Sequence, residues 1–369
     1  MKALILSCNT GQGHNTAGRA VLEALLARGI DAEMKDTLAF GGQKTSSYVS
    51  GSYISITQHV PRLFGQMYRA GATISNPYIK SPVYFANKLY ADKLCDYIAQ
   101  QGIDTVVCPH LFPAEALTYL RGKQGLKVRC YGVATDYTCT PFWEETDVDL
   151  FFIPHERLRA EYEKKGFAPE RLMVTGIPVS RVFREKVDMA TARKQLELPK
   201  EGRLFLLMSG SMGFGDVPDI VARLLALGDD AMRVLVLTGH NDRMTRVLKQ
   251  RFGEDARVLP VGYTKQVALY MDACDVTLTK PGGLTSTEAA VKNVPFVHTA
   301  PIPGCETENQ RFFGELGVAL PTKTPLESAQ AALLLCADGE LRSRQLKCQR
   351  EQINARAADD IVDAMLARQ

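Results

Sequence analysis

The feature that most constrains this chain is a twice-repeated alternation of short apolar runs with amphipathic stretches. Strands that alternate with helices predict a parallel sheet covered by helices on both faces. In the first half the expected strands lie at 3–7, 32–36, 105–108, 128–133, 150–154 and 172–176. The pattern restarts with runs at 203–211, 233–239, 256–262, 275–280 and 294–299. The sequence therefore predicts an α/β chain made of two Rossmann-like halves.

With 369 residues the chain is too long for one typical core, and this supports two domains. We place the first domain at 1–182 and the second at 183–349, with a C-terminal helix within 350–369 packing back on the first. In open parallel sheets, ligands bind where strand ends and helix N-termini meet. We therefore expect the two halves to face a cleft that these ends line.

Composition excludes several classes of protein. A net charge of +3 is too small to indicate nucleic-acid binding. The nine cysteines form no CxxC pair and no cluster with metal spacing, which favours reduced thiols in the cytoplasm and no bound metal. The apolar start is interrupted by Asn9 and Gly11 before a signal-peptide core could form, and no run reaches the roughly 20 residues of a membrane span. If the protein acts on lipids, we expect it to do so from the water side.

The segment from Gly41 to Tyr90 departs from the strand–helix pattern. It carries basic and aromatic residues but no Asp or Glu. Basic and aromatic residues without acids are typical of a surface that lies against an anionic membrane, while a solvated helical pair is the alternative. The candidate membrane-binding residues are Lys44, Arg62, Phe64, Arg69 and Lys80.

The first candidate site is GQGH, from Gly11 to His14, in the loop expected after the first strand. Gly13 allows a ligand such as a sugar-nucleotide donor to approach the backbone, and a helix N-terminus follows. The motif lacks the GK[ST] of a phosphate-binding P-loop, and Thr16 replaces the third glycine of a dinucleotide fingerprint. His14 can transfer protons near neutral pH, although a surface histidine in a capping contact is an equal alternative.

The second candidate site is TKPGGLTSTEAA, from Thr279 to Ala290, directly after an expected strand. A tight turn followed by a helix start presents backbone N–H groups and hydroxyls to one point, which suits a diphosphate. Glu288 suits the two hydroxyls of a ribose; the alternative is an acid that interacts with the helix dipole. The candidate donor-binding residues here are Gly282, Gly283, Leu284, Thr285, Ser286 and Glu288.

Three further loops are expected at the same edge of the second domain. PIPGCETENQ holds Glu306 and Asn309, which could bind hexose hydroxyls or act only as helix caps. The glycine-rich loop SGSMGFG contributes Ser211. VGYTKQV could hold a flat base near Tyr263 and Thr264.

In the first domain, Asp136 follows an expected strand and faces the expected cleft. The DVD sequence at 147–149 has the DxD form that metal-dependent glycosyltransferases of another fold use to bind a metal. It runs directly into the strand at 150–154, and this favours a turn before the strand rather than a metal site.

Together these motifs resemble the family of plant monogalactosyldiacylglycerol synthases and bacterial processive diacylglycerol glucosyltransferases, in glycosyltransferase family 28. The GxGH, TDY, VTGIPV, KPGGLTSTEA and PIPGCETEN motifs occur in the family's order along nearly the whole chain. The resemblance implies a GT-B fold, a UDP-hexose donor and a diacylglycerol-type lipid acceptor. It also implies inversion at the anomeric carbon without a catalytic metal or other cofactor, at the inner face of the cell membrane.

Carried over by motif, His14 resembles the family's acceptor-activating histidine and Asp136 a nearby acid. Glu288 resembles the ribose-binding glutamate, and Glu306 and Asn309 resemble residues around the donor hexose. The chain departs from the family pattern at Cys139 and Thr140, where a histidine is expected, and at Cys305, where glutamine is usual. The alternatives are a transferase acting on a polyprenyl or soluble acceptor, a UDP-sugar 2-epimerase and an NAD(P) oxidoreductase.

Overall fold

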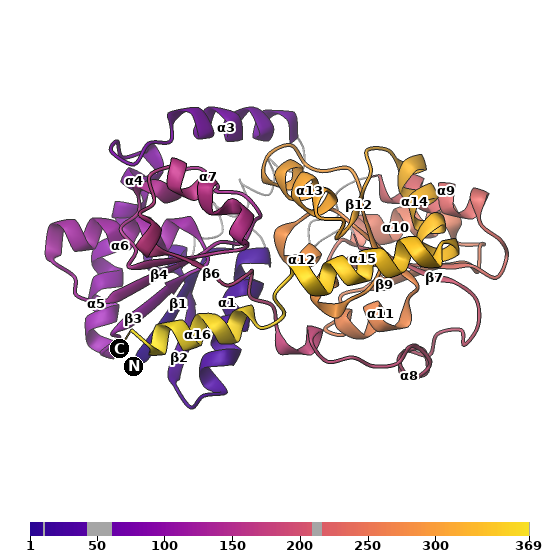
Figure 1. Cartoon of the computed structure of the whole chain (residues 1–369), viewed down its shortest axis with the longest axis horizontal. Helices are drawn as coiled ribbons and strands as arrows, with labels where there is room; N and C mark the ends of the chain where they lie inside the picture. Colours follow the sequence, from indigo (N-terminus) through magenta and orange to yellow (C-terminus); the bar gives the residue numbers. More distant parts are fainter. Residues whose placement is uncertain (10–11, 43–60, 209–215, 369) are drawn as a thin grey trace. The chain divides into compact units, whose positions relative to one another are not determined.

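The structure is a computed structural model, and it describes residues 1–369 except 10–11, 43–60, 209–215 and 369. Two compact units form the chain (Figure 1). Unit 1 comprises 1–180, 303–305 and 354–369, and unit 2 comprises 181–302 and 306–353. The first switch between units thus falls two residues before the predicted boundary.

Unit 1 is built on a six-stranded parallel sheet in the order β2-β1-β3-β4-β5-β6. The central strands are fully buried, because they are covered on both faces and consist of continuous apolar runs. The strands are β1 (Lys2–Ser7), β2 (Asp31–Asp36), β3 (Thr105–Cys108), β4 (Arg129–Val133), β5 (Leu150–Ile153) and β6 (Leu172–Val174).

The helices of unit 1 connect successive strands, as the alternating pattern predicts. Gly102 and Gly125 take left-handed φ values of 63° where α5 and α6 end, a conformation that glycine adopts without steric cost. The helices are α1 (Gln12–Leu26), η1 (Thr37–Gly41), α3 (Pro61–Ile74), α4 (Pro82–Asn87), η2 (Lys88–Tyr90), α5 (Ala91–Gln101), α6 (Leu111–Gln124), η3 (Trp143–Glu145), η4 (Glu156–Leu158), α7 (Arg159–Lys164), η5 (Pro169–Arg171) and α16 (Ala357–Leu366).

The C-terminal helix α16 packs against α1 in unit 1 (Figure 1). Ile361, Val362 and Met365 of α16 are buried there. Arg28 fixes this contact from beyond the end of α1, at 3.0 Å from Asp359 and 2.8 Å from Asp363.

Arg28→Ala should lower the free energy of unfolding by about 1–2 kcal/mol, because it removes charge-assisted hydrogen bonds that are only partly exposed. Arg19→Ala, at an exposed position of α1, is the matched control and should change it by less than about 0.5 kcal/mol. Urea unfolding of both variants measures the difference. Equal stabilities would show that the ion pairs do not hold α16.

Unit 2 repeats the design with a parallel sheet in the order β12-β11-β10-β7-β8-β9. Its strands are β7 (Leu204–Met208), β8 (Arg233–Gly239), β9 (Val258–Gly262), β10 (Val276–Thr279), β11 (Phe296–His298) and β12 (Leu320–Pro321). The sequence pattern did not predict β12, because a strand of two residues has no periodicity to detect.

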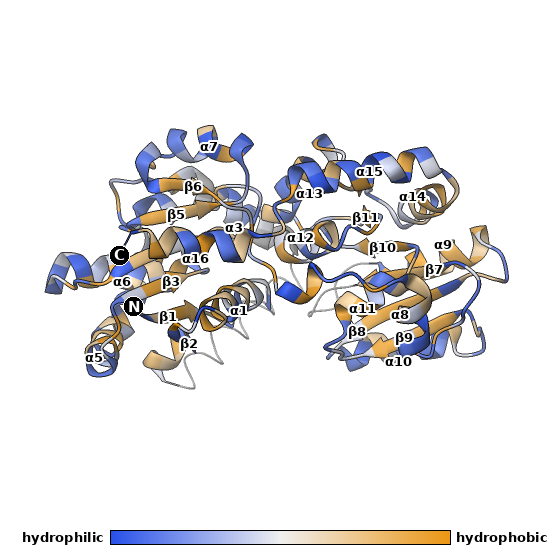
Figure 2. Ribbon diagram, turned by 60° about the horizontal axis from the view of Figure 1, so that its bottom comes forward, coloured by the Kyte–Doolittle hydropathy of each residue, from blue (hydrophilic) through white to orange (hydrophobic). Residues whose placement is uncertain are grey.

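The helices of unit 2 cover both faces of its sheet, whose strands are largely apolar in Figure 2. They are η6 (Arg181–Phe183), α8 (Met189–Gln195), α9 (Val217–Leu227), α10 (Asp242–Phe252), α11 (Val267–Ala273), α12 (Gly283–Lys292), α13 (Cys305–Glu315), α14 (Pro325–Ala337) and α15 (Gly339–Gln352). Both sheets are parallel, so the carboxyl ends of the strands within each unit lie at one edge and place the loops that follow them together.

The DVD sequence at 147–149 lies in the turn before β5, as predicted. Arg121 forms ion pairs with both Asp147 and Asp149, and Arg171 lies 2.9 Å from Asp147. The Cys130 backbone N–H donates to Asp149. These carboxylates therefore hold the turn before the strand in place.

Candidate active site

Gln12, Gly13 and His14 of the GQGH motif lie in the first turn of α1, which begins at Gln12, and Gly11 lies outside the described residues. This corrects the expectation that the motif is a loop ahead of the helix, and it places Gly13 and His14 at the helix N-terminus. Gly18, one turn further on, allows α1 to approach the sheet closely, since a Cβ there would lie 3.1 Å from both Ile5 and Met34. The close packing fixes His14 beside the carboxyl end of β1.

The Nδ1 atom of His14 lies 2.9 Å from the carbonyl oxygen of Pro109 and 2.9 Å from the Thr135 hydroxyl. A carbonyl oxygen can only accept a hydrogen bond, so Nδ1 must carry the proton in the neutral ring. The lone pair then lies on Nε2. Residues that follow β1, β3 and β4 thus meet at His14. Their contacts hold its ring in the tautomer that a general base needs.

His110 packs edge-on against His14, with ring centroids 4.6 Å apart. Its Nδ1 accepts a hydrogen bond from the Phe112 backbone N–H, which caps α6. Burial lowers the pKa of His14, although the Pro109 carbonyl opposes this shift. Burial and the neighbouring His14 lower the pKa of His110 further. Both rings are therefore neutral at physiological pH, and His14 can accept a proton there.

Asp136 follows Thr135 in the loop after β4 and is half-buried. It is thus next in sequence to the residue whose hydroxyl contacts His14. Cys139, which with Thr140 stands where the resembled family's histidine is expected, is buried, and its backbone N–H donates to Glu161. Burial raises the pKa of the Cys139 thiol, so Cys139 is a packing residue without acid–base function at neutral pH.

In unit 2 the TKPGG sequence forms a turn from β10 into α12, which begins at Gly283. The helical hydrogen-bond ladder starts with the Ser286 N–H donating to the Gly282 carbonyl. The N–H groups of Gly283, Leu284 and Thr285 therefore precede the ladder, which is the usual anion-binding geometry of a helix N-terminus. A Cβ added to Gly282 would meet nothing within 4 Å, so the turn borders open space.

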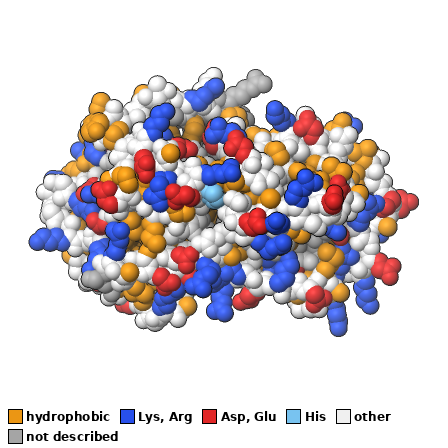
Figure 3. Space-filling model, in the orientation of Figure 1, with side chains coloured by type: hydrophobic (Ala, Val, Ile, Leu, Met, Phe, Trp, Pro, Cys, Tyr) orange, Lys and Arg blue, Asp and Glu red, His pale blue; other side chains and the backbone are white. Residues whose placement is uncertain are grey.

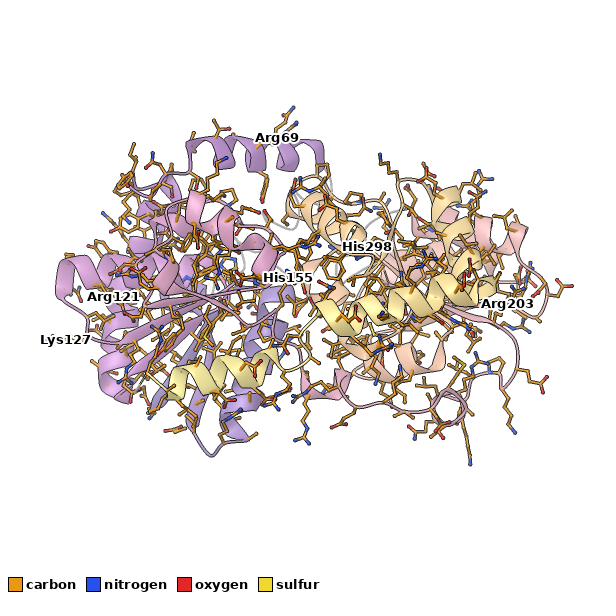
Figure 4. All side chains as sticks on the ribbon, viewed as in Figure 1. Arg69, Arg121, Lys127, His155, Arg203 and His298 are labelled. Atoms are coloured by element: carbon orange, nitrogen blue, oxygen red, sulfur yellow. The ribbon has the colours of Figure 1, made fainter. Side chains whose placement is uncertain are left out.

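The Ser286 side chain faces the interior of unit 2, and its predicted contact with the diphosphate stays a prediction. Its side chain is 0% exposed, and its hydroxyl lies 2.8 Å from Nε2 of His298. His298 lies inside unit 2 (Figure 4), and burial lowers its pKa to about 3. The Ser286 hydroxyl thus has a partner within the unit, while the N–H groups of Gly283, Leu284 and Thr285 precede the ladder.

Glu306 and Asn309 of α13 brace the same turn. Glu306 lies 2.5 Å from the Lys280 ammonium and accepts a hydrogen bond from the Ile302 N–H at 3.0 Å. Asn309, which is 0% exposed, donates to the Pro281 carbonyl at 3.0 Å. Glu288 is also buried. Their contacts with ribose and hexose remain predictions, while the observed geometry gives Glu306 and Asn309 a positioning role.

Tyr263 lies at the carboxyl end of β9 and is 60% exposed. Its ring stacks on His240, which follows β8, with centroids 4.3 Å apart and an angle of 16°. Thr264 accepts a hydrogen bond from the Gln266 N–H. Tyr263 and His240 together form an exposed flat surface at the carboxyl edge of the sheet, the same edge from which the loop into α12 emerges. Base binding at this surface stays a prediction. Ser211 lies outside the described residues.

The segment 61–90 contains most of the large apolar side chains that are exposed in unit 1. They are Ile74, Tyr78, Ile79, Phe85 and Leu89, and Tyr78 is 92% and Leu89 88% exposed. Arg69 is exposed on α3 (Figure 4). Lys44 lies outside the described residues. Arg62 and Phe64 lie in α3, but the structure describes only their backbone. Exposed aromatic and aliphatic residues beside cations are typical of an interfacial membrane surface.

Lys80 does not belong to this exposed surface. Its ammonium donates to the Glu145 carbonyl and lies 5.0 Å from the centre of the Tyr84 ring. Burial and the neighbouring Glu145 raise the pKa of Glu115 to about 10, so Glu115 is protonated at neutral pH. Lys80 was predicted to bind anionic lipid, and this stays a prediction; in the structure its ammonium ties the segment to the rest of unit 1.

Basic and acidic side chains are interspersed on the face shown in Figure 3, without a continuous basic patch. Among the residues that the structure describes, no helix is both long and apolar enough to cross a bilayer.

The sequence analysis missed three groups of this site: the Pro109 carbonyl, His110 and Thr135. A signal for His110 was available, since it lies shortly after the buried strand β3, at the carboxyl edge of the sheet where His14 was sought after β1. Pro109 and Thr135 contribute through single atoms, a carbonyl oxygen and a hydroxyl, that approach His14 from distant parts of the sequence. No sequence pattern predicts such contacts.

The family model described as Monogalactosyldiacylglycerol (MGDG) synthase matches residues 14–179. The chain is 25% identical to the processive diacylglycerol β-glucosyltransferase of Bacillus cytotoxicus, covering 99% of this chain and 93% of the relative. It is 24% identical to the enzyme of that name from Bacillus subtilis, covering 99% and 94%. The chain is a glycosyltransferase with the GT-B fold. The resemblance to this family, predicted from its motifs, is thereby confirmed.

Solved structures support the fold of this glycosyltransferase. MurG of Acinetobacter baumannii matches with a TM-score of 0.62 and 14% identity, over 99% of each chain. The UDP-GlcNAc 2-epimerase of Neisseria meningitidis, bound to UDP-GlcNAc, matches with a TM-score of 0.65 and 14% identity, over 100% of each chain. At these identities the likeness establishes the architecture alone.

Proposed function

We propose that this glycosyltransferase moves a hexose from a UDP-sugar to the hydroxyl of a diacylglycerol-type lipid, as a peripheral protein at the inner, cytoplasmic face of the membrane. The observation that carries the chemistry is His14, whose Nδ1–H contact with Pro109 leaves a basic lone pair on Nε2. The relatives' names support the acceptor, and two structural neighbours were solved with UDP or a UDP-sugar.

In the proposed reaction, Nε2 of His14 takes the proton of the acceptor hydroxyl, assisted by Asp136. The acceptor oxygen forms a bond to the anomeric carbon from the face opposite the diphosphate. The bond from that carbon to the diphosphate breaks, UDP leaves, and the configuration inverts. The N–H groups of Gly283, Leu284 and Thr285 stabilise the charge on the departing diphosphate without a catalytic metal. EDTA should therefore leave the rate unchanged.

Thermal-shift measurements test the donor half of this proposal. UDP and UDP-glucose should raise the unfolding midpoint, because they bind the folded state. NAD should not raise it. A shift with NAD and none with any UDP-sugar would instead support an oxidoreductase.

Glu288→Gln should weaken UDP binding by roughly 10- to 100-fold, since a charged acceptor of ribose hydrogen bonds contributes about 1.5–3 kcal/mol. Glutamine preserves the volume of this buried side chain, so the fold should survive. Glu315→Gln, at an exposed position of α13, is the matched control. Calorimetry that finds equal UDP affinity in both variants would remove Glu288 from the donor site.

A further inference from the structure

Unit 1 contains a pocket of about 390 Å³ beside the segment that carries the exposed apolar residues. It lies among η1, α4, η2 and the start of α6. Its walls include Leu38, Val83, Ala86, Leu89, Tyr90 and Phe112. These side chains are all apolar except for the Tyr90 hydroxyl.

The polar groups of the wall are hydrogen-bonded to one another. Asn87, which also lines the pocket, donates to the Val83 carbonyl at 2.9 Å. The Tyr90 hydroxyl lies 2.5 Å from the Asn87 amide oxygen and 3.2 Å from the Phe112 carbonyl. A wall with its polar groups already bonded suits a hydrocarbon better than a sugar or a nucleotide.

One side of the pocket adjoins the exposed apolar surface. Leu89 lines the pocket and is 88% exposed, and Phe85, on the same short helical segment, is 53% exposed. Lys88, between them, lies 4.5 Å from the centre of the Phe85 ring. An apolar rim with a cation suits the entry of a lipid chain from a bilayer, because the chain remains in apolar surroundings while the cation faces headgroups.

Phe112, which also lines the pocket, leads to the proposed catalytic base His14 through two ring contacts. The Phe112 ring lies 4.6 Å from His110, and His110 lies 4.6 Å from His14. A chain seated against Phe112 would thus hold the polar end of its lipid two aromatic rings from the proposed base. Binding energy from such a remote part of a substrate can position the reacting hydroxyl.

We propose that this pocket binds one acyl chain of the lipid acceptor and thereby makes the enzyme selective for long-chain acceptors. The inference rests on the proposed function, because it requires a lipid acceptor whose hydroxyl reacts near His14. The occupant is one hydrocarbon chain that enters from the membrane past Leu89.

The test fills the pocket from its rim. Ala86 is exposed and lines the pocket, so Ala86→Trp inserts bulk without disturbing the core. Ala99→Trp, at an exposed position of α5 away from the pocket, is the matched control. Dioleoylglycerol and dihexanoylglycerol are compared as acceptors in the same mixed micelles, with UDP-glucose as donor.

Ala86→Trp should raise KM for dioleoylglycerol about tenfold or more and leave KM for dihexanoylglycerol within about twofold, since only the long chain loses buried methylenes. Leu89→Gln should act in the same direction, and Ala99→Trp should match wild type. Equal KM changes for both chain lengths, or no change in either variant, would overturn the proposal that the pocket binds an acyl chain. The proposed transferase function would be unaffected. If wild type glucosylates neither diacylglycerol, the proposed function fails, and this inference fails with it.

Discussion

His14→Ala should lower the rate of sugar transfer by about 10²–10⁴ while leaving UDP affinity nearly unchanged, as expected for loss of a general base. The expectation follows from the Nδ1–H contact with Pro109, which leaves the basic lone pair on Nε2. UDP binding is assigned to unit 2, so calorimetry with UDP should be insensitive to the change. His155→Ala is the matched control, since His155 lies in unit 1 and caps a different helix, η4.

The pH profile provides a second readout of the same prediction. Burial lowers the pKa of His14 below its ordinary value of 6.5, so the ring stays neutral, and able to accept a proton, to lower pH than a solvated histidine. We therefore expect kcat/KM to be constant around neutral pH and to fall on the acid side only below 6.5. His14→Ala should remove this acid limb. A residual rate within a few-fold of wild type, with the limb retained, would transfer the role of base to another group.

Replacing Ile74, Tyr78 and Ile79 together by serine should reduce partitioning onto vesicles by roughly 100-fold. These three side chains are 61%, 92% and 67% exposed between α3 and α4, where no core requires them. Burial of large apolar side chains contributes about 1.5–3 kcal/mol each when complete, so even partial insertion of three gives about 3 kcal/mol. Flotation with vesicles that contain anionic lipid measures the loss.

The control for this variant is the serine substitution of Leu227, Leu326 and Leu334 in unit 2, which are 48%, 41% and 50% exposed. It also removes three exposed apolar side chains, although these are less exposed, and should leave flotation unchanged. Wild-type binding should also weaken as salt rises, because attraction between cations such as Arg69 and anionic lipid is screened. If the wild-type protein stays in the soluble fraction at low salt, the proposal that this segment binds membranes is contradicted.

The alternating pattern predicted the architecture well, because each buried parallel strand is encoded by its own short run of apolar residues between turns. Every predicted strand is present, and only β12, with two residues, was missed. The start of α1 was predicted too late in the sequence. Glycine has a low helix propensity, so Gly13 was assigned to a loop although it lies in the first helical turn.

The site was harder to predict, because its chemistry depends on contacts between distant loops. His14 and Asp136 were found from their positions after strands. The tautomer of His14 depends on Pro109 and Thr135, at sequence separations of 95 and 121. Ser286 was assigned from its motif and Lys80 from the composition of its segment, and neither signal could predict the buried partners that the structure gives them, His298 and Glu145.

The most direct test of the account is to follow a radiolabelled hexose from UDP-glucose in the presence of vesicles that contain dioleoylglycerol. The account predicts that label enters the lipid extract as a glucosyl lipid with a β linkage, that one UDP is released for each sugar transferred, and that EDTA does not alter the rate. Label that remains in the aqueous phase, as unreacted donor or as a 2-epimer of a UDP-sugar, would contradict transfer to a lipid.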